Sequence, residues 1–299
     1  MDQGNGSGWC LMNGLTGNAK MIDVPGGRIA YAVSGEGPLV VLAHGMGDNR
    51  SAYRFLAPLL VAAGYRVAAV DLRGHGQSST GWASYTHADI AGDLLAVIAA
   101  ERGPAVIVGH SCSGGAATVA AGTHPDQVAA VVEIGPATRP YRMNVSALLL
   151  SRRYRRGVLL LARGAFLGSV PAWAKYLDHA YPGVKPPDWD AWLAALLASL
   201  REDDRMRAVR AIGTSPATGT AAQLPRVRCP ALVIMGTLDP DWPSPRAEAA
   251  AIAGLLPAGT GRSVMIEGAG HYPHAQYPAQ TADAIVAFLG EHAAGRDRA

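Results

Sequence analysis

The sequence predicts an α/β fold with a doubly wound, mostly parallel sheet that is interrupted by one helical insertion. Short apolar runs, typical of strands buried on both faces, alternate with helical segments along the first part of the chain and again near its end. This alternation with short links places helices on both faces of a parallel sheet. It stops between residues 137 and 216, where helical stretches occur without a clear strand. One domain with an insertion therefore fits better than two domains in tandem.

The first half of the chain supplies five expected strands and three expected helices. The strands are Arg28–Ser34, Leu39–Ala43, Arg66–Val70, Ala105–Val108 and Val128–Ile134. Helical apolar spacing covers Tyr53–Ala63, which Gly64 ends. Thr86, with Asp89 three residues later, is expected to cap a helix that runs to about Ala100. A third helix, made of small residues, is expected over Gly115–Ala121.

The second half supplies the insertion and the last strands. Within the insertion, helical spacing covers Val145–Tyr154 and Trp189–Leu200, and the later elements are the strands Ala231–Met235 and Ser263–Ile266 and the helix Thr281–Ala293. We therefore expect a flexible leader over residues 1–20, a core built from residues 21–136 and 217–293, and a helical insertion over residues 137–216.

Composition limits the classes of function. Apolar residues make up 49% of the 299 residues and charged residues 16%, which argues against a disordered chain. A net charge of +3 does not suggest a nucleic-acid binder. Residues 137–216 hold 13 Lys/Arg against 6 Asp/Glu, net +7, while the remainder holds 13 against 17, net −4. This basic segment is most simply a solvated surface, although it could favour an anionic substrate or an acidic partner. The Arg152-Arg-Tyr-Arg-Arg run is likewise most simply a solvated helix face.

Three cysteines, Cys10, Cys112 and Cys229, are too few for a disulfide framework, and no Cys/His cluster has the spacing of a zinc site. We expect neither a metal nor another cofactor. No apolar run approaches the roughly 20 residues of a spanning helix, so no membrane insertion is expected. The N-terminus lacks the features of a signal peptide, and a cytoplasmic, bacterial protein is the default expectation.

The segment from Val106 to Ala117 carries the main chemical signal. A buried strand enters a tight turn that holds Ser111 and continues directly into a helix of small residues. A nucleophile elbow requires this strand–turn–helix context, because the turn is strained and the helix packs close to the strand. The motif is Gly-x-Ser-x-Gly with one departure, since Ser113 stands where the second glycine is usual. Ser113 is a second, less favoured candidate for the nucleophile. A glycine-rich turn can also bind phosphate, but no GxGxxG or Walker pattern accompanies it.

A serine hydroxyl needs a general base, and the base needs an acceptor that fixes its tautomer. His271 lies in a loop after the last expected strand, where open α/β sheets gather their sites, and His274 is its rival. Asp239 follows the strand at residues 231–235 and is the expected acid. Asp241 and Glu133 are its rivals for that role.

The tetrahedral intermediate would need two preorganised hydrogen-bond donors for its oxyanion. We expect the backbone N–H groups of Cys112, directly after the nucleophile, and of Met46, in the loop after Leu39–Ala43. The Cys112 thiol itself is expected to be structural.

Five segments in this order resemble the α/β-hydrolase superfamily, in particular its members with a helical cap. They are His44-Gly-Met-Gly, Asp71-Leu-Arg-Gly-His-Gly-Gln-Ser, Gly109-His-Ser-Cys-Ser-Gly-Gly, Gly236-Thr-Leu-Asp-Pro-Asp-Trp-Pro and Gly268-Ala-Gly-His-Tyr-Pro-His. The resemblance covers roughly residues 22–289 and implies the α/β-hydrolase fold, a cap over residues 137–216 and the triad Ser111, Asp239 and His271. It also implies that the segment at residues 71–78 is structural, so that His75 is not catalytic.

A cap over the sheet edge would exclude water and shape a pocket. Most aromatic residues of the insertion are expected in the cap core. Candidate substrate contacts are His44, Trp82, Trp173 and Trp242. The apolar composition suggests a small-to-medium, largely apolar ester or other acyl compound.

Three functions compete. The first is a serine hydrolase that cleaves an ester, lactone or thioester through an acyl-enzyme. The second is an acyltransferase or carbon–carbon bond hydrolase, which would use the same triad and so cannot be separated by motif. The third, of another class, is a small-molecule binder with little turnover, which an intact triad argues against.

Overall fold

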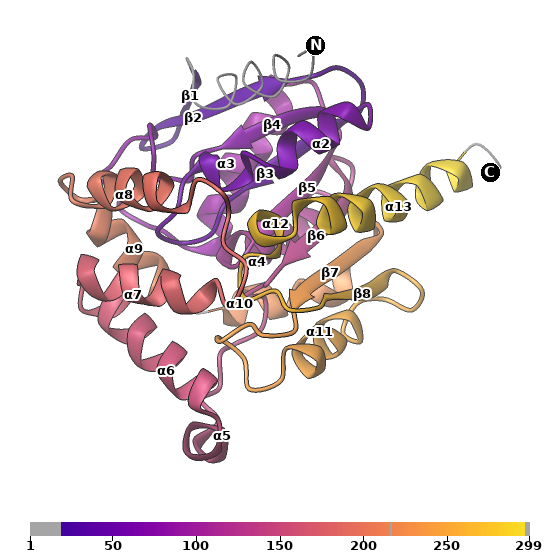
Figure 1. Ribbon diagram of the computed structural model, residues 1–299. Coiled ribbons are helices and arrows are strands. Elements are labelled where there is room, and N and C mark those ends of the chain that lie inside the picture. The colour runs from indigo at the N-terminus through magenta and orange to yellow at the C-terminus, as the bar shows by residue number, and fades with distance from the viewer. Residues whose placement is uncertain (1–18, 216, 297–299) are drawn as a thin grey trace, which may run out of the picture.

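The computed structural model describes residues 19–215 and 217–296, so most of the expected leader at residues 1–20 lies outside the described residues. Eight strands form one sheet in the order β1-β2-β4-β3-β5-β6-β7-β8 (Figure 1). They are β1 Lys20–Val24, β2 Gly27–Ser34, β3 Leu39–Ala43, β4 Arg66–Val70, β5 Ala105–His110, β6 Val128–Ile134, β7 Ala231–Gly236 and β8 Gly261–Ile266. Strands β3 to β8 pair in parallel, and β1 and β2 are antiparallel. The predicted doubly wound α/β fold is confirmed. Strand β1 was not predicted.

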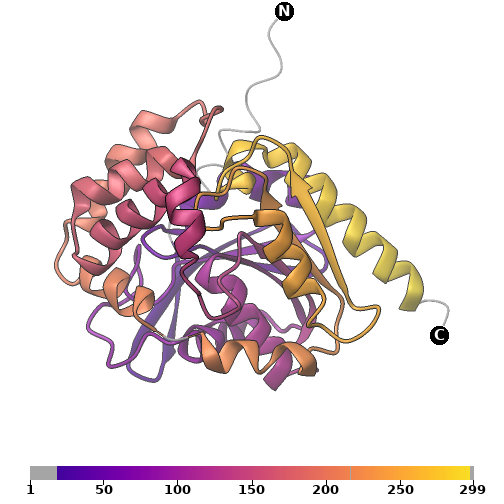
Figure 2. The same cartoon turned by 90° about the horizontal axis from the view of Figure 1, so that it is seen from below.

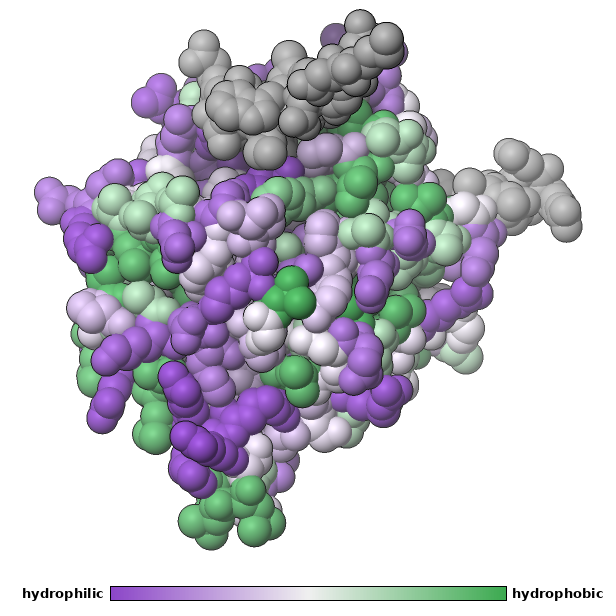
Figure 3. Space-filling view, in the orientation of Figure 1, coloured by the Kyte–Doolittle hydropathy of each residue, from purple (hydrophilic) through white to green (hydrophobic). Residues whose placement is uncertain are grey.

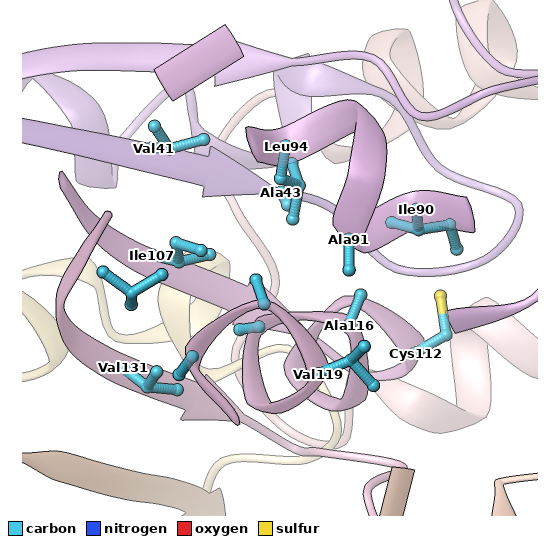
Figure 4. Close-up of a cluster of buried hydrophobic side chains, with 14 of the residues drawn as sticks. Val41, Ala43, Ile90, Ala91, Leu94, Ile107, Cys112, Ala116, Val119 and Val131 are labelled. Carbon is cyan, nitrogen blue, oxygen red and sulfur yellow. The ribbon is translucent and has the colours of Figure 1, made fainter. Parts of the chain in front are cut away.

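Alternation along the buried strands divides the core into two layers. Leu39 and Val41 of β3 face one hydrophobic cluster, while Val40 and Leu42 face the other, because successive side chains point to opposite faces of a sheet. Helices α3 (His87–Ala100), α4 (Cys112–Thr123) and α11 (Pro245–Ala253) cover the first face. Helices α2 (Leu56–Ala62) and α13 (Pro278–Arg296) cover the second. Figure 2 shows the helices on both sides of the sheet, and Figure 4 shows where α3 and α4 meet the strands.

Several element bounds differ from the prediction for local reasons. The helix expected over Tyr53–Ala63 is a 3-10 turn, η1 (Arg50–Tyr53), followed by α2. The helix expected over Val145–Tyr154 is broken at Ser151, whose extended backbone (φ −107°, ψ 108°) ends α5 (Val145–Leu150) while its side chain caps α6 (Arg152–Leu161). Helix α4 begins three residues earlier than expected, directly after Ser111.

Residues 137–215 form a layer of helices beside the sheet (Figures 1 and 2). After α5 and α6 come the π-helical turn η2 (Ala162–Phe166), α7 (Val170–Ala180), α8 (Trp189–Leu200) and α9 (Arg205–Gly213). The chain returns to the core through α10 (Thr218–Ala221) and η3 (Leu224–Arg226), and α12 (Pro273–Gln276) precedes α13. The layer has its own apolar cluster, which includes Trp173, Tyr176 and Tyr181 and extends to Tyr272 of the core. Within the described part of the chain, no helix combines the length and apolarity needed to cross a membrane.

Candidate active site

Ser111 occupies a sharp turn between β5 and α4. Its backbone has φ 55° and ψ −118°, a region that a non-glycine residue adopts only when the surrounding structure imposes it. A side chain at Gly109 would approach the Ser113 carbonyl oxygen to 2.2 Å, so glycine is required where the strand and helix cross. The next residue, Cys112, is the first of α4, where backbone N–H groups have no acceptor within the helix. The turn thus presents the serine beside a backbone N–H group at the start of a helix.

Ser113, the departure from the usual motif, has helical backbone in α4 and a specific partner. Its hydroxyl, fully buried, donates a hydrogen bond of 2.6 Å to the carbonyl oxygen of His44. This bond joins the nucleophile turn to the loop that was expected to supply the second oxyanion donor. The substitution of serine for glycine therefore adds a tether and does not strain the turn.

Two buried histidines hold that loop, residues 44–47, from the other side. His44 Nε2 accepts from the Leu72 N–H at 3.0 Å, and its Nδ1 donates to the Gly45 carbonyl at 2.7 Å. His75 Nε2 accepts from the Gly47 N–H at 3.1 Å. Burial lowers the pKa of His44 to about 4 and that of His75 to about 3. Both rings stay neutral and keep one nitrogen free to accept, as their bonds to the backbone require.

Met46, between these anchored residues, lies beside Cys112. Burial raises the pKa of the Cys112 thiol to about 11, and the backbone amide of Met46 acts in the opposite direction, which places that amide at the thiol. A thiol with so high a pKa is unreactive, and Figure 4 shows Cys112 within the apolar cluster near Ile90 and Ala116. The buried position of the thiol fits the expectation that Cys112 would contribute only its backbone N–H group.

His271 is positioned by a buried carboxylate. Its Nδ1 lies 2.8 Å from Oδ2 of Asp239, whose side chain has no exposed surface. A carboxylate at Nδ1 leaves Nε2 unprotonated in the neutral ring, which is the tautomer that a general base needs. The backbone also fixes the ring, because the His271 N–H donates to the Ala180 carbonyl at 2.9 Å.

Asp241, the rival acid, lies on the opposite side of the same ring. Its Oδ2 is 3.6 Å from His271 Nε2, and it accepts from the Tyr176 hydroxyl at 2.8 and 2.9 Å. Its own N–H donates to Asp239 Oδ1 at 2.9 Å. Burial opposes charge on His271, but the two carboxylates outweigh it and raise its pKa to about 9. Asp241 is therefore an electrostatic neighbour of His271, whereas Asp239 makes the hydrogen bond to Nδ1.

His274 and Glu133 both have surroundings that do not suit the catalytic roles considered for them. His274 is fully buried against the Tyr53 ring, with a centroid distance of 4.9 Å, and neither of its ring nitrogens has a hydrogen-bond partner among the described residues. Burial lowers its pKa to about 3. Glu133 accepts from the Thr138 and Thr118 hydroxyls and makes no described contact with His271. Burial raises the Glu133 pKa to about 7.

A cavity of about 660 Å³ brings the candidate residues together. Ser111, Cys112, Met46, His271 and Asp241 all contribute to its wall. The rest of the wall is mainly apolar and comes largely from the inserted helices, among them Val158, Leu161, Phe166 and Ile212. The group Asp239, Asp241 and His271 brings three possible metal ligands within 4.8 Å of one another. An ion there would compete with the His271–Asp239 hydrogen bond.

A model of the alpha/beta hydrolase family matches residues 40–284. The chain belongs to this family. Among curated proteins, Epoxide hydrolase A of Mycobacterium tuberculosis is 27% identical over 318 residues, which cover 90% of this chain and 96% of that protein. Epoxide hydrolase B of the same organism is 40% identical over 104 residues, 33% of this chain, and the chain aligns with only 29% of that relative's length.

Solved structures share the fold of this α/β hydrolase. An esterase from Rhodococcus sp. has a TM-score of 0.72 and 25% identity, with 91% of this chain and 98% of that chain covered. A thermophilic esterase from Thermogutta terrifontis has a TM-score of 0.70 and 23% identity, with 92% and 99% covered.

The expected substrate contacts divide into two groups in this hydrolase. Trp173 and Trp242 line the cavity, and the Trp173 Nε1 also donates to the Gly47 carbonyl at 3.2 Å. Trp82 is not among the residues that line this cavity and stacks on Arg73, with its ring centroid 4.5 Å from the guanidinium carbon, so its role as a substrate contact stays a prediction. His44 is not among the residues that line this cavity either, and both its ring nitrogens bond to the backbone.

Sequence reasoning did not identify Tyr176 as part of the site, because an insertion tyrosine has no motif around it. Only the fold brings its hydroxyl to Asp241. The sequence offered only an indirect signal for such a residue. Asp239 and Asp241 follow the same strand end, and if one of them orients His271, the other needs a different hydrogen-bond partner.

Proposed function

We propose that this α/β hydrolase cleaves carboxylic esters, or related lactones and thioesters, through an acyl-enzyme on Ser111. The observation that carries the proposal is the imposed backbone of Ser111 in a cavity that also exposes His271, with buried Asp239 on His271 Nδ1. This combination supplies a nucleophile, a base and an orienting acid.

The reaction follows from these roles. Ser111 Oγ attacks the carbonyl carbon while His271 Nε2 takes the hydroxyl proton, and the N–H groups of Cys112 and Met46 stabilise the oxyanion. The tetrahedral intermediate expels the alcohol, which leaves with the proton from His271. Water then attacks the acyl-enzyme, giving its proton to His271, and the second intermediate releases the acid as the proton returns to Ser111.

The chemistry of serine separates this proposal from epoxide opening, the activity named for two of the relatives. A serine oxygen that opened an epoxide would form an ether, which has no carbonyl for water to attack. A serine that attacks an ester forms a new ester, which water can hydrolyse. Ser111 therefore favours acyl transfer to water over a covalent epoxide mechanism.

The cavity wall supports a largely apolar acyl or alcohol group. Its side chains are mainly apolar and aromatic, and burial of such a group gains about 25 cal/mol per Å². An acyltransferase or a carbon–carbon bond hydrolase would use the same three residues, and no described contact favours either activity.

A fluorophosphonate probe followed by peptide mass analysis tests the nucleophile. We expect one adduct on Ser111, together with turnover of p-nitrophenyl esters. Ser111→Ala should abolish the label and lower kcat by about 10⁵–10⁶. An adduct on Ser113 or stoichiometric binding without turnover would overturn the proposal.

A further inference from the structure

The end of the cap that lies farthest from the sheet exposes a cluster of large apolar side chains. We call residues 141–156 the cap rim; they comprise the end of the loop after β6, helix α5 and the first half of α6. Leu149 is 75% exposed and Leu150 87% exposed, and Met143 and Val145 are exposed beside them. Helix α5 buries no residue. It forms the lower tip of the molecule in Figure 1, and a green protrusion marks the same place in Figure 3.

Positive charge surrounds this apolar tip. Between residues 134 and 177 the sequence has seven arginines and no acidic residue. Of the rim arginines, Arg142, Arg152, Arg155 and Arg156 are exposed, and none forms an ion pair within residues 19–215 and 217–296. Figure 3 shows hydrophilic side chains directly above the apolar tip. Four exposed arginines without a carboxylate partner among the described residues therefore lie next to the apolar tip in the sequence.

The rim also lies at the entrance to the catalytic cavity. Tyr141 and Met143 contribute to the cavity wall and are both exposed, at 48% and 59%. A wall residue with half its surface in solvent marks the place where the cavity opens. The apolar surface therefore continues from the tip into the site.

We propose that the cap rim docks on an anionic phospholipid surface, with Leu149 and Leu150 at the acyl boundary and the arginines among the headgroups. Amphipathic segments with cationic and apolar faces bind such surfaces through these two contributions. A second copy of the chain fits less well, because a symmetric contact would oppose arginine to arginine. This attachment is shallow and requires no spanning helix, so it is compatible with the expectation that the chain does not insert into a membrane.

Docking would let an ester dissolved in the lipid enter the cavity without crossing water. This step rests on the proposed function, whereas docking itself does not. Ser111→Ala separates the two, because that variant should bind vesicles like the unchanged protein and hydrolyse nothing.

Co-sedimentation with phosphatidylglycerol/phosphatidylcholine vesicles tests docking, with vesicles of phosphatidylcholine alone for comparison. We expect binding only to the anionic vesicles, weakened by added salt as the charges are screened. Leu149→Ser with Leu150→Ser should weaken binding about tenfold or more. Arg152→Glu with Arg156→Glu should weaken it at least about tenfold.

Matched controls are Leu255→Ser and Arg228→Glu, exposed residues of the core outside the rim, which should bind like the unchanged protein. A thermal melt confirms that each variant folds, and the two rim pairs test the proposal independently. Equal binding by the rim pairs and the controls, equal binding to both vesicle types, or no binding would overturn it. So would a dimer in solution that the leucine pair dissolves, because the rim would then serve a second copy.

Discussion

Asp241 places a second negative charge beside the reactive nitrogen of His271, and its removal should change the pH at which the enzyme becomes active. In the proposed mechanism, His271 must be neutral to accept the Ser111 proton. With a pKa of about 9, it is mostly protonated at pH 7 in the free enzyme. We therefore expect kcat/KM to rise with pH and to level off above about pH 9. Asp241→Asn keeps the shape of the side chain and an acceptor for the Tyr176 hydroxyl but removes the charge.

The separation of 3.6 Å between Asp241 Oδ2 and His271 Nε2 sets the size of the effect. Coulomb's law gives about 1 kcal/mol at the dielectric constant of water and about 5 kcal/mol at an effective value of 20. Since 1.36 kcal/mol corresponds to one pKa unit, even the smaller figure lowers the midpoint by nearly one pH unit. Loss of the charge stabilises the neutral ring, so Asp241→Asn should be more active than the unchanged enzyme near pH 7.

The assay is the pH dependence of kcat/KM for a soluble p-nitrophenyl ester, measured with both proteins. Asp239→Asn is the matched control, because it also removes one charge near His271 but disturbs the tautomer. It should lower the plateau by about 10⁴ at every pH rather than move the midpoint alone. An unchanged profile in Asp241→Asn, or a midpoint near 6.5 in the unchanged enzyme, would refute the assigned charge environment of the base.

Three other perturbations test separate parts of the site. Ser113→Ala removes the hydrogen bond to His44 and leaves a buried carbonyl unpaired, so chemical denaturation should show a loss of about 1–3 kcal/mol in the free energy of unfolding. We expect kcat to change more than KM, and an effect on KM alone would contradict the role of this bond as a tether. Trp82→Ala should lower the free energy of unfolding by about 3–5 kcal/mol without changing the KM of any remaining activity. Trp242→Ala, in the cavity wall, should change the preferred ester chain length. A change of chain-length preference in Trp82→Ala but not in Trp242→Ala would contradict the two placements. The His274 pKa of about 3 lies below its unfolded value, so His274 costs stability as pH falls below about 6.5. Relative to the unchanged protein, the free energy of unfolding of His274→Phe should therefore gain about 2 kcal/mol between pH 8 and pH 5 in denaturation curves. A difference that does not depend on pH would show that His274 is not buried in its neutral form.

The fold could be predicted because its strands carry their own signal. Runs such as Leu39–Ala43 are buried on both faces, so nearly every residue is apolar and the run is visible without knowledge of its neighbours. Strand β1 has no such run: it lies at the sheet edge, pairs only with β2, and alternates exposed with half-buried residues. Its existence depends on a partner that lies later in the chain.

Some residues of the candidate site could likewise be predicted from local sequence, and others could not. Ser111, Asp239 and His271 follow strand ends in recognisable loops; Ser111 and His271 line one cavity, and Asp239 bonds to His271 Nδ1. Trp82 also belongs to a loop that follows a strand, yet its ring turns toward Arg73, a direction that no local pattern encodes. The bond from Ser113 to His44 spans 69 residues and depends on how β3 and β5 pair.

The cap and His271, the proposed base, are joined so closely that the whole cap cannot lift without disturbing His271. The His271 N–H bonds to Ala180 at the end of α7, and Tyr176 of α7 bonds to Asp241. The Gln276 amide, just after the histidine loop, donates to the carbonyl groups of Pro182 and Val184 at 2.8 Å. Helix α5 buries no residue, and its described side-chain bonds run to α6, where the Arg155 guanidinium donates to the Leu148 and Leu149 carbonyl groups. We therefore expect substrate to enter by movement of the cap rim, whose exposed residues Tyr141 and Met143 line the cavity, while α7 stays fixed beside His271.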